Sequence, residues 1–470
     1  MSLPGPFVRI IVRRLTSLGL FGLAAALLSA CASSQSAPSA AGGAPLTPFA
    51  KRLSLGSSNL PTHVVVIVQE NRSVDNLFQQ LPGIDTQNYG LNKKGKKIAL
   101  TAEPLAWPAD PSHAHAAFVT EFDNGKLDGF AQEKCSPDCG TDGAYSYVEP
   151  SDVTQYYAMA EQYAFAEHNL QPNEGPSMPG HIYMIAAESG QPGSTWYLSE
   201  NPKTAPKTAK NCLAPAGTTD GFINMTTAYP GVENATYASP CLNGTPTIID
   251  EIASAGLTWK YYTPNIGNLW TAPCNISKYG CPNNPNVITP QTQVLTDIAN
   301  GALANVSWVI PSAPDSDHPV SKGGGGGPAW VSSVVDAIGQ SQYWQNTAIF
   351  VVWDDWGGWY DHYTNGNNHP ASNPTDPYEY GFRVPLIAIG PYVRPGYISS
   401  TPRNSTSILH FIEDNFGLAS LGYLDSQTDD LGELFNFAQN PNPFQPFDMG
   451  GMTLQERRMQ PPDPRPVDSD

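Results

Sequence analysis

The clearest pattern along the chain is a set of four apolar runs, each five or six residues long. None of them shows the strict alternation of apolar and polar residues that marks a strand with one face in water. Continuous apolar runs of this length are typical of strands that are buried on both faces of a sheet. The runs cover residues 64–68, 306–310, 348–353 and 384–389.

Helical patterns lie between and beside these runs. Three of the patterns are followed by a glycine, which is common where a helix ends. The segments are 155–168, 247–255 before Gly256, 329–338 before Gly339, 406–416 before Gly417, and a shorter one from Pro179 to about Glu188. Buried strands that alternate with helices predict an α/β fold, an α/β/α sandwich with a largely parallel central sheet.

Polar residues follow three of the predicted strands at the point where each strand ends. They are Glu70 and Asn71 after the first run, Asp315, Asp317 and His318 after the run at 306–310, and Asp354 and Asp355 after the run at 348–353. Functional groups gather at the carboxyl ends of the strands in sheets of this kind. The sequence therefore predicts a polar site at one edge of the sheet.

The N-terminus has the pattern of an export signal. Arg9, Arg13 and Arg14 precede a mostly apolar stretch over residues 15–28, which is shorter than the ~20 residues that span a bilayer. The stretch leads into Leu-Ser-Ala-Cys, which resembles a bacterial lipobox in which Cys31 is acylated. A soluble secreted protein with a coincidental cysteine is the alternative, and the paired arginines leave a twin-arginine export route open.

Composition divides the chain into four parts. Residues 1–31 are predicted to be a lipoprotein signal peptide, and residues 32–60, rich in Ser, Ala, Gly and Pro, a disordered tether. A single folded domain is expected over 61–450, followed by a flexible tail at 451–470. Because no Asp follows Cys31, we predict an exported lipoprotein of the bacterial cell envelope, in the outer membrane and facing the periplasm or the surface.

The charge balance excludes one class of partner. Without the three arginines of the leader, 24 − 3 = 21 basic residues stand against 42 acidic ones, a formal charge of −21. Nucleic-acid binding depends on Lys and Arg that neutralise phosphates, so we expect no nucleic-acid partner. A strongly acidic chain fits a protein that binds cations.

Six cysteines remain when Cys31 is set aside, and an even number in an exported protein indicates three disulfides. Fifteen pairings are formally possible. We expect pairing between nearest neighbours, 135–139, 212–241 and 274–281. A zinc site is the alternative, but no adjacent histidine completes a zinc-ligand pattern.

Ser177 is the candidate nucleophile. It stands in Gly-Pro-Ser-Met-Pro, just before a predicted helix. A hydroxyl at that place is near free backbone N–H groups and the positive end of the helix dipole, which suits an anionic phosphoryl group. Contact with a metal ion would lower its pKa. The two oxygen-rich pairs at the strand ends could hold that ion, and a nucleophile with a divalent cation is what phosphate-ester hydrolysis requires.

Several segments spread through the chain resemble, in the right order, the motifs of the bacterial phospholipase C and acid phosphatase family of phosphoesterases. Each motif alone is weak, but the ordered set is highly specific. The segments are 63–78 (HVVVIVQENRSVDNLF), 110–113 (DPSH), 124–130 (NGKLDGF), 173–183 (NEGPSMPGHIY), 316–319 (SDHP), 351–362 (VVWDDWGGWYDH), 381–390 and 405–418.

This resemblance implies a fold like that of alkaline phosphatase and an activity as a metal-dependent phosphoesterase that acts on a phosphate ester or a phospholipid. Ser177 would be both the nucleophile and a metal ligand, and His113 and His318 would contact the phosphoryl or leaving oxygens. The other implied metal ligands are Glu70, Asn71, Asp354 and Asp355. A site built from carboxylates and one amide suits Ca²⁺, Mg²⁺ or Mn²⁺ more than Zn²⁺.

The chain departs from the family pattern in two places. The phospholipase C branch usually has Thr followed by Pro-Asn-Arg at the nucleophile, whereas Ser177 is followed by Met-Pro-Gly-His, and the run at 351–362 is closer to the acid phosphatase branch. Residues 404–407 read Asn-Ser-Thr-Ser in place of Asp-His-Thr-Ser, which removes one histidine contact.

Four other residues complete the predictions. His362 is expected to orient Asp355 or one of its neighbours, and Asp317 is a further candidate beside His318. His115 and His181 are expected to be structural or surface residues.

Two alternatives belong to other classes of function. One is a metal-independent serine hydrolase with Ser177, His318 and an Asp, but the chain lacks the Gly-x-Ser-x-Gly elbow and the two acidic pairs would have no role. The other is a non-catalytic surface lipoprotein with a relict site. The substrate stays open at this point, since its selection would depend on loops such as 190–245 and 262–295.

Overall fold

The computed structural model describes residues 59–202, 211–215, 217–224, 232–238, 241–319, 324–364, 380–465 and 467. The predicted signal peptide, the predicted lipidation site Cys31 and almost all of the predicted tether lie outside these residues. Within the described ranges, no helix is both long enough and apolar enough to cross a bilayer.

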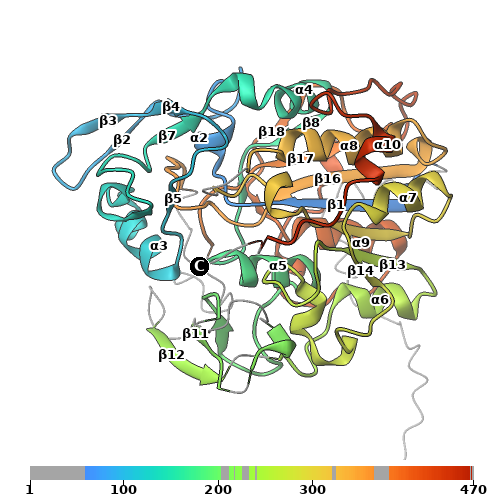
Figure 1. Ribbon diagram of the computed structural model, residues 1–470, viewed down its shortest axis with the longest axis horizontal. Helices are drawn as coiled ribbons and strands as arrows, with labels where there is room; N and C mark the ends of the chain where they lie inside the picture. The colour runs from blue at the N-terminus through green and yellow to red at the C-terminus, as the bar shows by residue number, and fades with distance from the viewer. Residues whose placement is uncertain are drawn as a thin grey trace, which may run out of the picture. The chain divides into compact units, whose positions relative to one another are not determined.

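An eight-stranded sheet forms the centre of the structure (Figure 1). In sheet order its strands are β14 (Val287–Ile288), β13 (Trp259–Tyr262), β15 (Val306–Val309), β1 (His63–Gln69), β16 (Thr347–Trp353), β17 (Leu386–Ile389), β8 (Ala164–Ala166) and β18 (Tyr397–Ser399). β17 pairs antiparallel with both of its neighbours, and the other pairs are parallel. The predicted largely parallel sheet is confirmed, and all four apolar runs are strands in it.

Helices cover both faces of this sheet, as the alternating pattern predicted. α4 (Thr154–Gln162) and α8 (Gly327–Gly339) lie on one face, where α7 (Gln293–Ala299) and α10 (Leu454–Arg458) pack against α8. α5 (Ser177–Ala186), α6 (Ile248–Ser254) and α9 (Ser407–Phe416) lie on the other face (Figure 1). The α/β/α sandwich is therefore present.

The predicted helix at 155–168 is too long. α4 ends at Gln162, and residues 164–166 form strand β8, in which all three side chains are fully buried. Ala-Phe-Ala is compatible with either element, and its pairing with β17 and β18 decides the outcome. Tertiary pairing overrides local helical preference here.

The segment between β1 and α4 builds a smaller unit beside the sheet. It contains α2 (Val74–Leu77), β2 (Tyr89–Leu91), β3 (Lys97–Ala99), β4 (Thr101–Glu103), β5 (Asp110–Pro111), α3 (His115–Phe122), β6 (Cys135–Ser136) and β7 (Ser146–Val148). Its aromatic core includes Phe118 and Phe130 and packs against Trp356, which follows β16. This core holds the loop with His113 close to the end of β16.

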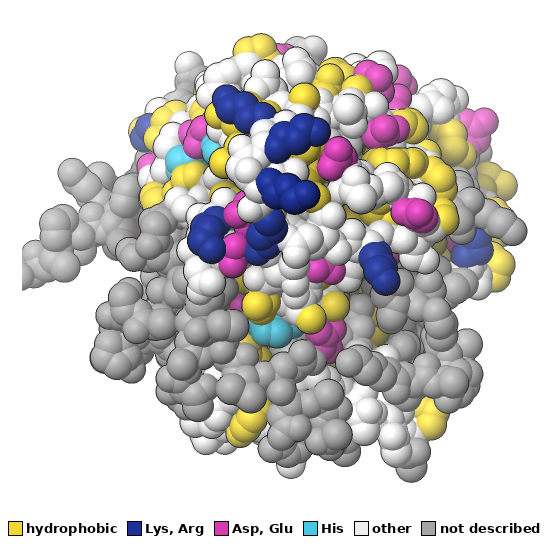
Figure 2. Space-filling model, turned by 90° about the vertical axis from the view of Figure 1, so that its left-hand side faces the viewer, with side chains coloured by type: hydrophobic (Ala, Val, Ile, Leu, Met, Phe, Trp, Pro, Cys, Tyr) yellow, Lys and Arg dark blue, Asp and Glu magenta, His cyan; other side chains and the backbone are white. Residues whose placement is uncertain are grey.

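Lysines gather on this unit although the chain as a whole is acidic. Lys93, Lys94, Lys96 and Lys97 are exposed at the tip of the β2–β3 hairpin. Figure 2 shows lysine and arginine side chains concentrated on this face of the molecule. Lys93 is paired with Asp123 and Asp128, at 2.7 and 3.4 Å.

Two further groups of strands lie outside the central sheet. β10 (Trp196–Leu198), β11 (Thr219–Asn224) and β12 (Val232–Ala238) form an antiparallel sheet, and β9 (Asn169–Leu170) pairs with β19 (Arg403–Asn404).

The three disulfides, Cys135–Cys139, Cys212–Cys241 and Cys274–Cys281, join nearest neighbours as predicted.

Part of the segment expected to be a flexible tail is packed against the domain. α10 lies within it, and Arg457 of this helix is buried and donates to Asp315 at 3.0 Å. The buried ion pair fixes this helix beside the sheet, a contact that the polar, proline-rich composition did not indicate. The boundaries expected for the other segments stay predictions.

Candidate active site

The register of the two central strands brings the two acidic pairs together. β1 and β16 are paired along their whole length, with Gln69 opposite Trp353. Glu70 and Asp354 therefore leave the sheet side by side, and the Asp354 amide donates to the Gln69 carbonyl at 3.0 Å. Both carboxylates are fully buried.

One face of α5 lies against this strand end. Ser177, Gly180 and His181 occupy positions i, i+3 and i+4, which share a face of a helix. A Cβ on Gly180 would stand only 2.9 Å from the Asp354 carbonyl oxygen, so glycine permits the close approach of the helix. Ser177 and His181 are thereby brought to the two acidic pairs from the same side.

Asp354 is held by backbone donors on one oxygen. Its Oδ1 accepts from the amides of Asn71 and Asp355, at 3.0 and 2.8 Å. Asn71 donates this bond from a left-handed conformation with φ of 61°. Oδ2 of Asp354 has no hydrogen-bond partner among the described residues and lies 3.6 Å from His181 Nε2.

Asp355 contacts the candidate nucleophile directly. Ser177 Oγ donates to its Oδ2 at 3.1 Å, and the Gly357 amide donates to its Oδ1 at 2.7 Å. Burial, and after it the charge of Asp354, raises the pKa of the Asp355 carboxyl well above its usual value. Gly357 itself has φ of +65°, and a Cβ there would be 2.3 Å from the Asn71 carbonyl oxygen.

His181 is the site residue that the sequence interpretation missed. Its Nε2 lies 2.9 Å from Glu70 Oε1, and its ring is fully buried. Glu70, His181 and Asp354 each offer one ligand atom, and these atoms lie within 4.8 Å of one another. Burial lowers the pKa of His181 to about 4, although the charge of Asp354 opposes this. The sequence placed His181 in the helix predicted to follow Ser177, but that place alone indicates no functional role.

The donor set at the strand ends fits a metal ion. Asn71 Oδ1 and Asp354 Oδ2 are buried oxygens without a hydrogen-bond partner in the described part of the chain. A buried polar atom without a partner is costly, and a cation would remove that cost for both oxygens. Carboxylate and amide oxygens are the ligands that hard divalent cations prefer. The cluster can therefore hold a metal ion.

The two predicted histidines meet at the same edge. The rings of His113 and His318 are 5.9 Å apart between centroids, in an edge-to-face arrangement. His113 Nδ1 lies 2.9 Å from the Pro111 carbonyl and its Nε2 lies 3.0 Å from Asn71 Nδ2. Because a carbonyl only accepts, Nδ1 carries a proton, and the Asn71 amide donates to Nε2. This contact turns the Asn71 oxygen away from His113.

Asp317, predicted as a further candidate, takes part in a different set of contacts. Its Oδ2 accepts from Tyr156 Oη and Trp353 Nε1, at 2.9 and 3.0 Å. Burial raises the pKa of Asp317 to about 6, although Arg72 opposes the shift. Asp317 thus links α4 to the end of β16 through these two hydrogen bonds.

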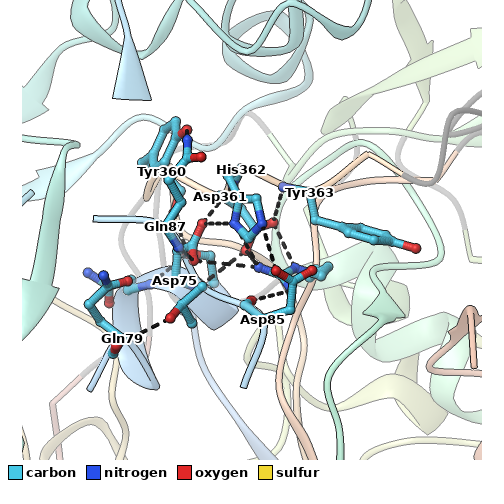
Figure 3. Close-up of polar contacts among 12 residues, drawn as sticks. Asp75, Gln79, Asp85, Gln87, Tyr360, Asp361, His362 and Tyr363 are labelled. Atoms are coloured by element: carbon cyan, nitrogen blue, oxygen red, sulfur yellow. Dashed lines mark hydrogen bonds and ion pairs between the residues drawn. The ribbon is translucent and has the colours of Figure 1, made fainter. Parts of the chain in front are cut away.

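His362 does not contact Asp355 among the described interactions. Its ring lies between the carboxylates of Asp75 and Asp85 (Figure 3). Nδ1 is 2.6 Å from Asp75 Oδ2, and Nε2 is 3.2 Å from Asp85 Oδ1. Asp361, next to it, accepts two bonds from Arg383, at 2.9 and 3.1 Å. This network connects α2, the loop after β16 and the residues that lead into β17, so it supports the site from outside.

The network around His362 predicts a stability that depends on pH. Burial disfavours the imidazolium, but the hydrogen bond to Asp75 and the charges of Asp75 and Asp361 outweigh it and raise the pKa of His362. The contribution of His362 to the free energy of unfolding is therefore fully present below its unfolded-state pKa. It is lost as pH rises through the higher pKa that His362 has in the folded protein. We expect His362→Gln to lose about 2 kcal/mol at acidic pH, the typical contribution of a hydrogen bond to a charged group, and less at pH 8. Urea denaturation of both proteins across this pH range is the measurement, and an equal loss at both ends would contradict it.

Comparison with known proteins identifies the family of the chain. A model of the Phosphoesterase family matches residues 62–419, so the chain belongs to this family and its class is that of phosphoric ester hydrolases.

The chain is similar to two bacterial phospholipases. The non-hemolytic phospholipase C of Pseudomonas aeruginosa is 23% identical over 81% of this chain and 58% of that protein. Phospholipase C A of Mycobacterium tuberculosis is 22% identical over 82% of this chain and 79% of that protein. The matched region thus spans little more than half the length of the Pseudomonas relative.

A solved structure of a protein in the alkaline phosphatase superfamily from Vibrio parahaemolyticus also matches. It aligns over 79% of this chain and 72% of its own, with a TM-score of 0.34 and 12% sequence identity.

Proposed function

We propose that the chain is a metal-dependent phosphoesterase that hydrolyses phosphate esters with Ser177 as its nucleophile. One observation carries this proposal: a single face of α5 places the Ser177 hydroxyl 3.1 Å from Asp355 and His181 2.9 Å from Glu70. Membership of the Phosphoesterase family supports the choice of reaction.

Ser177 and Asp355 would perform the first chemical step. Ser177 Oγ forms a bond to phosphorus, and the bond between phosphorus and the leaving oxygen breaks. The hydroxyl already donates to Asp355 Oδ2, so this carboxylate is in place to receive the proton. Water then cleaves the resulting phosphoserine and regenerates the hydroxyl.

Five residues would hold the metal ion: Glu70, Asn71, Ser177, Asp354 and Asp355. The bound ion would neutralise negative charge on the phosphoryl oxygens and favour the ionised hydroxyl. Because oxygen ligands predominate, we expect Ca²⁺, Mg²⁺ or Mn²⁺ rather than Zn²⁺.

His113 and His318 would contact the phosphoryl or leaving oxygens. Their edge-to-face packing puts two imidazole rings together at the carboxyl end of the sheet. His113 also fixes the Asn71 side chain through the bond from Asn71 Nδ2. A loss of His113 should therefore affect both metal binding and turnover.

Small phosphate esters are the proposed substrate class. The relatives are named phospholipases C, but Ser177 and the Asp-Asp-Trp-Gly-Gly-Trp-Tyr-Asp-His run are closer to the acid phosphatase branch. The formal charge of −18 for the whole chain also disfavours anionic bilayers, where each Lys or Arg that contacts the surface is worth about 1 kcal/mol. The lysines of the β2–β3 hairpin are a local exception to this charge.

A hydrolysis panel with and without chelator tests the function. We expect release of phosphate from small monoesters to exceed release of diacylglycerol from phosphatidylcholine vesicles. We also expect excess chelator to abolish both activities and added Mn²⁺, Mg²⁺ or Ca²⁺ to restore them. Faster turnover of phosphatidylcholine would move the enzyme to the phospholipase branch, and full activity in chelator would favour the metal-independent serine hydrolase.

The location of the protein is a separate proposal. The two relatives described above are bacterial proteins, and the leader pattern supports export with acylation at Cys31. Fractionation of cells that produce the wild-type chain or Cys31→Ser tests the anchor, because only the variant should be recovered as soluble protein.

A further inference from the structure

We propose that His181 is a positioning residue: its Nε2–H group holds the Glu70 carboxylate in the orientation that binds the cation, without ligating the cation itself. This inference rests on the proposed function, because it assigns a role within the same metal site. It also extends the site beyond the residues to which the family resemblance assigns a role, since His181 was expected to be a structural or surface residue.

The position of His181 follows from the packing of α5. Gly180 lets the helix approach the Asp354 carbonyl, and the next residue then projects between the two strand ends. His181 Nε2 is 2.9 Å from Glu70 Oε1 and 3.6 Å from Asp354 Oδ2. One ring nitrogen thus faces carboxylates that leave two different strands.

The environment of the ring assigns its proton to Nε2. A carboxylate oxygen only accepts, so the contact of 2.9 Å with Glu70 requires a proton on Nε2 or a protonated Glu70. Nδ1 is buried and has no hydrogen-bond partner among the described residues. If Nε2 ligated a metal ion, the proton of the neutral ring would have to sit on Nδ1, as a buried donor without an acceptor. Histidines that ligate metals almost always donate from the other ring nitrogen, and the described structure provides no group for that.

Packing keeps the ring in this orientation. His181 is fully buried and stacks on Trp270, with centroids 6.2 Å apart and an angle of 20° between the planes. The Trp270 backbone is fixed in turn by a hydrogen bond of 2.6 Å from Tyr261 Oη to its carbonyl. This packing therefore fixes the imidazole with its Nε2–H group directed at Glu70.

Loss of this donor should weaken cation binding. Without His181, Glu70 would lose a hydrogen bond that fixes its carboxylate, and the carboxylate could turn away from Asp354. Removal of such a supporting group typically lowers metal affinity 10- to 100-fold. Glutamine can place an amide N–H near the position of Nε2, so His181→Gln should retain most of the affinity, whereas His181→Ala should not.

Calorimetric titration with Mn²⁺ tests the role in the full-length protein. We expect affinity to fall 10- to 100-fold in His181→Ala and to stay within a few-fold of wild type in His181→Gln. His63→Gln is the matched control, because His63 begins β1 and stands at the opposite end of the strand from Glu70. Circular dichroism and thermal melting report whether each variant is folded, and His181→Gln keeps the test informative if the alanine variant is not.

Pulsed electron paramagnetic resonance of the Mn²⁺ complex separates positioning from ligation. We expect the signals of directly coordinated nitrogen to be the same in wild type and His181→Gln. A strongly coupled nitrogen that disappears in His181→Gln would show that His181 is a ligand and would overturn the inference. Equal affinity for Mn²⁺ in wild type and folded His181→Ala would overturn it as well. Wild-type protein that binds no divalent cation would instead refute the proposed function.

Discussion

Replacement of Ser177 by alanine should lower kcat by roughly 10³-fold or more while the domain stays folded. The reason is that Ser177 is the only hydroxyl that the described structure places in a hydrogen bond to Asp355, so the covalent step loses its nucleophile. The side chain is fully buried at the start of α5, and alanine fits the same space. Steady-state kinetics with a chromogenic phosphate monoester, together with circular dichroism, measure the two parts of this result.

Two variants make the Ser177 result specific. Ser177→Thr should keep part of the activity, because it retains the hydroxyl and the phospholipase branch of the family has threonine there. Ser333→Ala is a control for loss of a buried hydroxyl, since Ser333 lies in α8 and bonds only to the Ala329 carbonyl of its own helix among the described interactions. A Ser177→Ala enzyme with wild-type turnover would refute the mechanism.

The sequence predicted the parts of the fold that local pattern determines. The apolar run from Val64 to Val68 predicts a strand that is buried on both faces. This run forms most of β1, which pairs with both β15 and β16 at the centre of the sheet. A continuous apolar run carries no information on strand direction, so the antiparallel pairing of β17 was not visible in it. β8 was assigned to a helix because three residues of mixed preference acquire their structure only from their neighbours in the sheet.

The sequence predicted those residues of the candidate site that directly follow a strand. Glu70 and Asp354 directly follow buried strands, and the pairing of β1 with β16 necessarily brings them together. His181 escaped prediction because its role depends on how closely α5 approaches Asp354, which Gly180 sets and no pattern of polar residues reveals. The catalytic and metal-binding roles of all these residues stay predictions.

His362 was predicted to support the site beside Asp355, but its described contacts lie elsewhere in the structure. Its position near Asp355 in the sequence suggested that it orients Asp355 or one of its neighbours, since the two residues belong to one motif. The chain turns between them at Gly357 and Gly358, both with positive φ, and carries His362 to Asp75 and Asp85 instead. Proximity in sequence is a poor guide across a turn of this kind.

Asp354→Asn should remove both cation binding and hydrolysis, the second large effect that the structure predicts. The substitution removes one negative charge from a fully buried site and replaces one carboxylate oxygen by an amide N–H. Asparagine can still accept through its oxygen from the amides of Asn71 and Asp355, so the loop after β16 should keep its fold. We expect a loss of roughly 10²-fold or more in metal affinity and a corresponding loss of turnover at fixed metal concentration.

Thermal melting with and without Mn²⁺ measures the effect of Asp354→Asn independently of turnover. A ligand at 100 times its Kd stabilises a folded protein by about 2.7 kcal/mol, so the wild-type Tm should rise clearly when Mn²⁺ is added. Asp354→Asn should show little or no rise under the same conditions. Asp336→Asn is the control, because Asp336 is also a buried acid but lies in α8, where it accepts from the Phe447 amide. An Asp354→Asn protein with the wild-type Tm shift would mean that the cation binds without this carboxylate, and the ligand set would then have to be drawn from the other residues of the site.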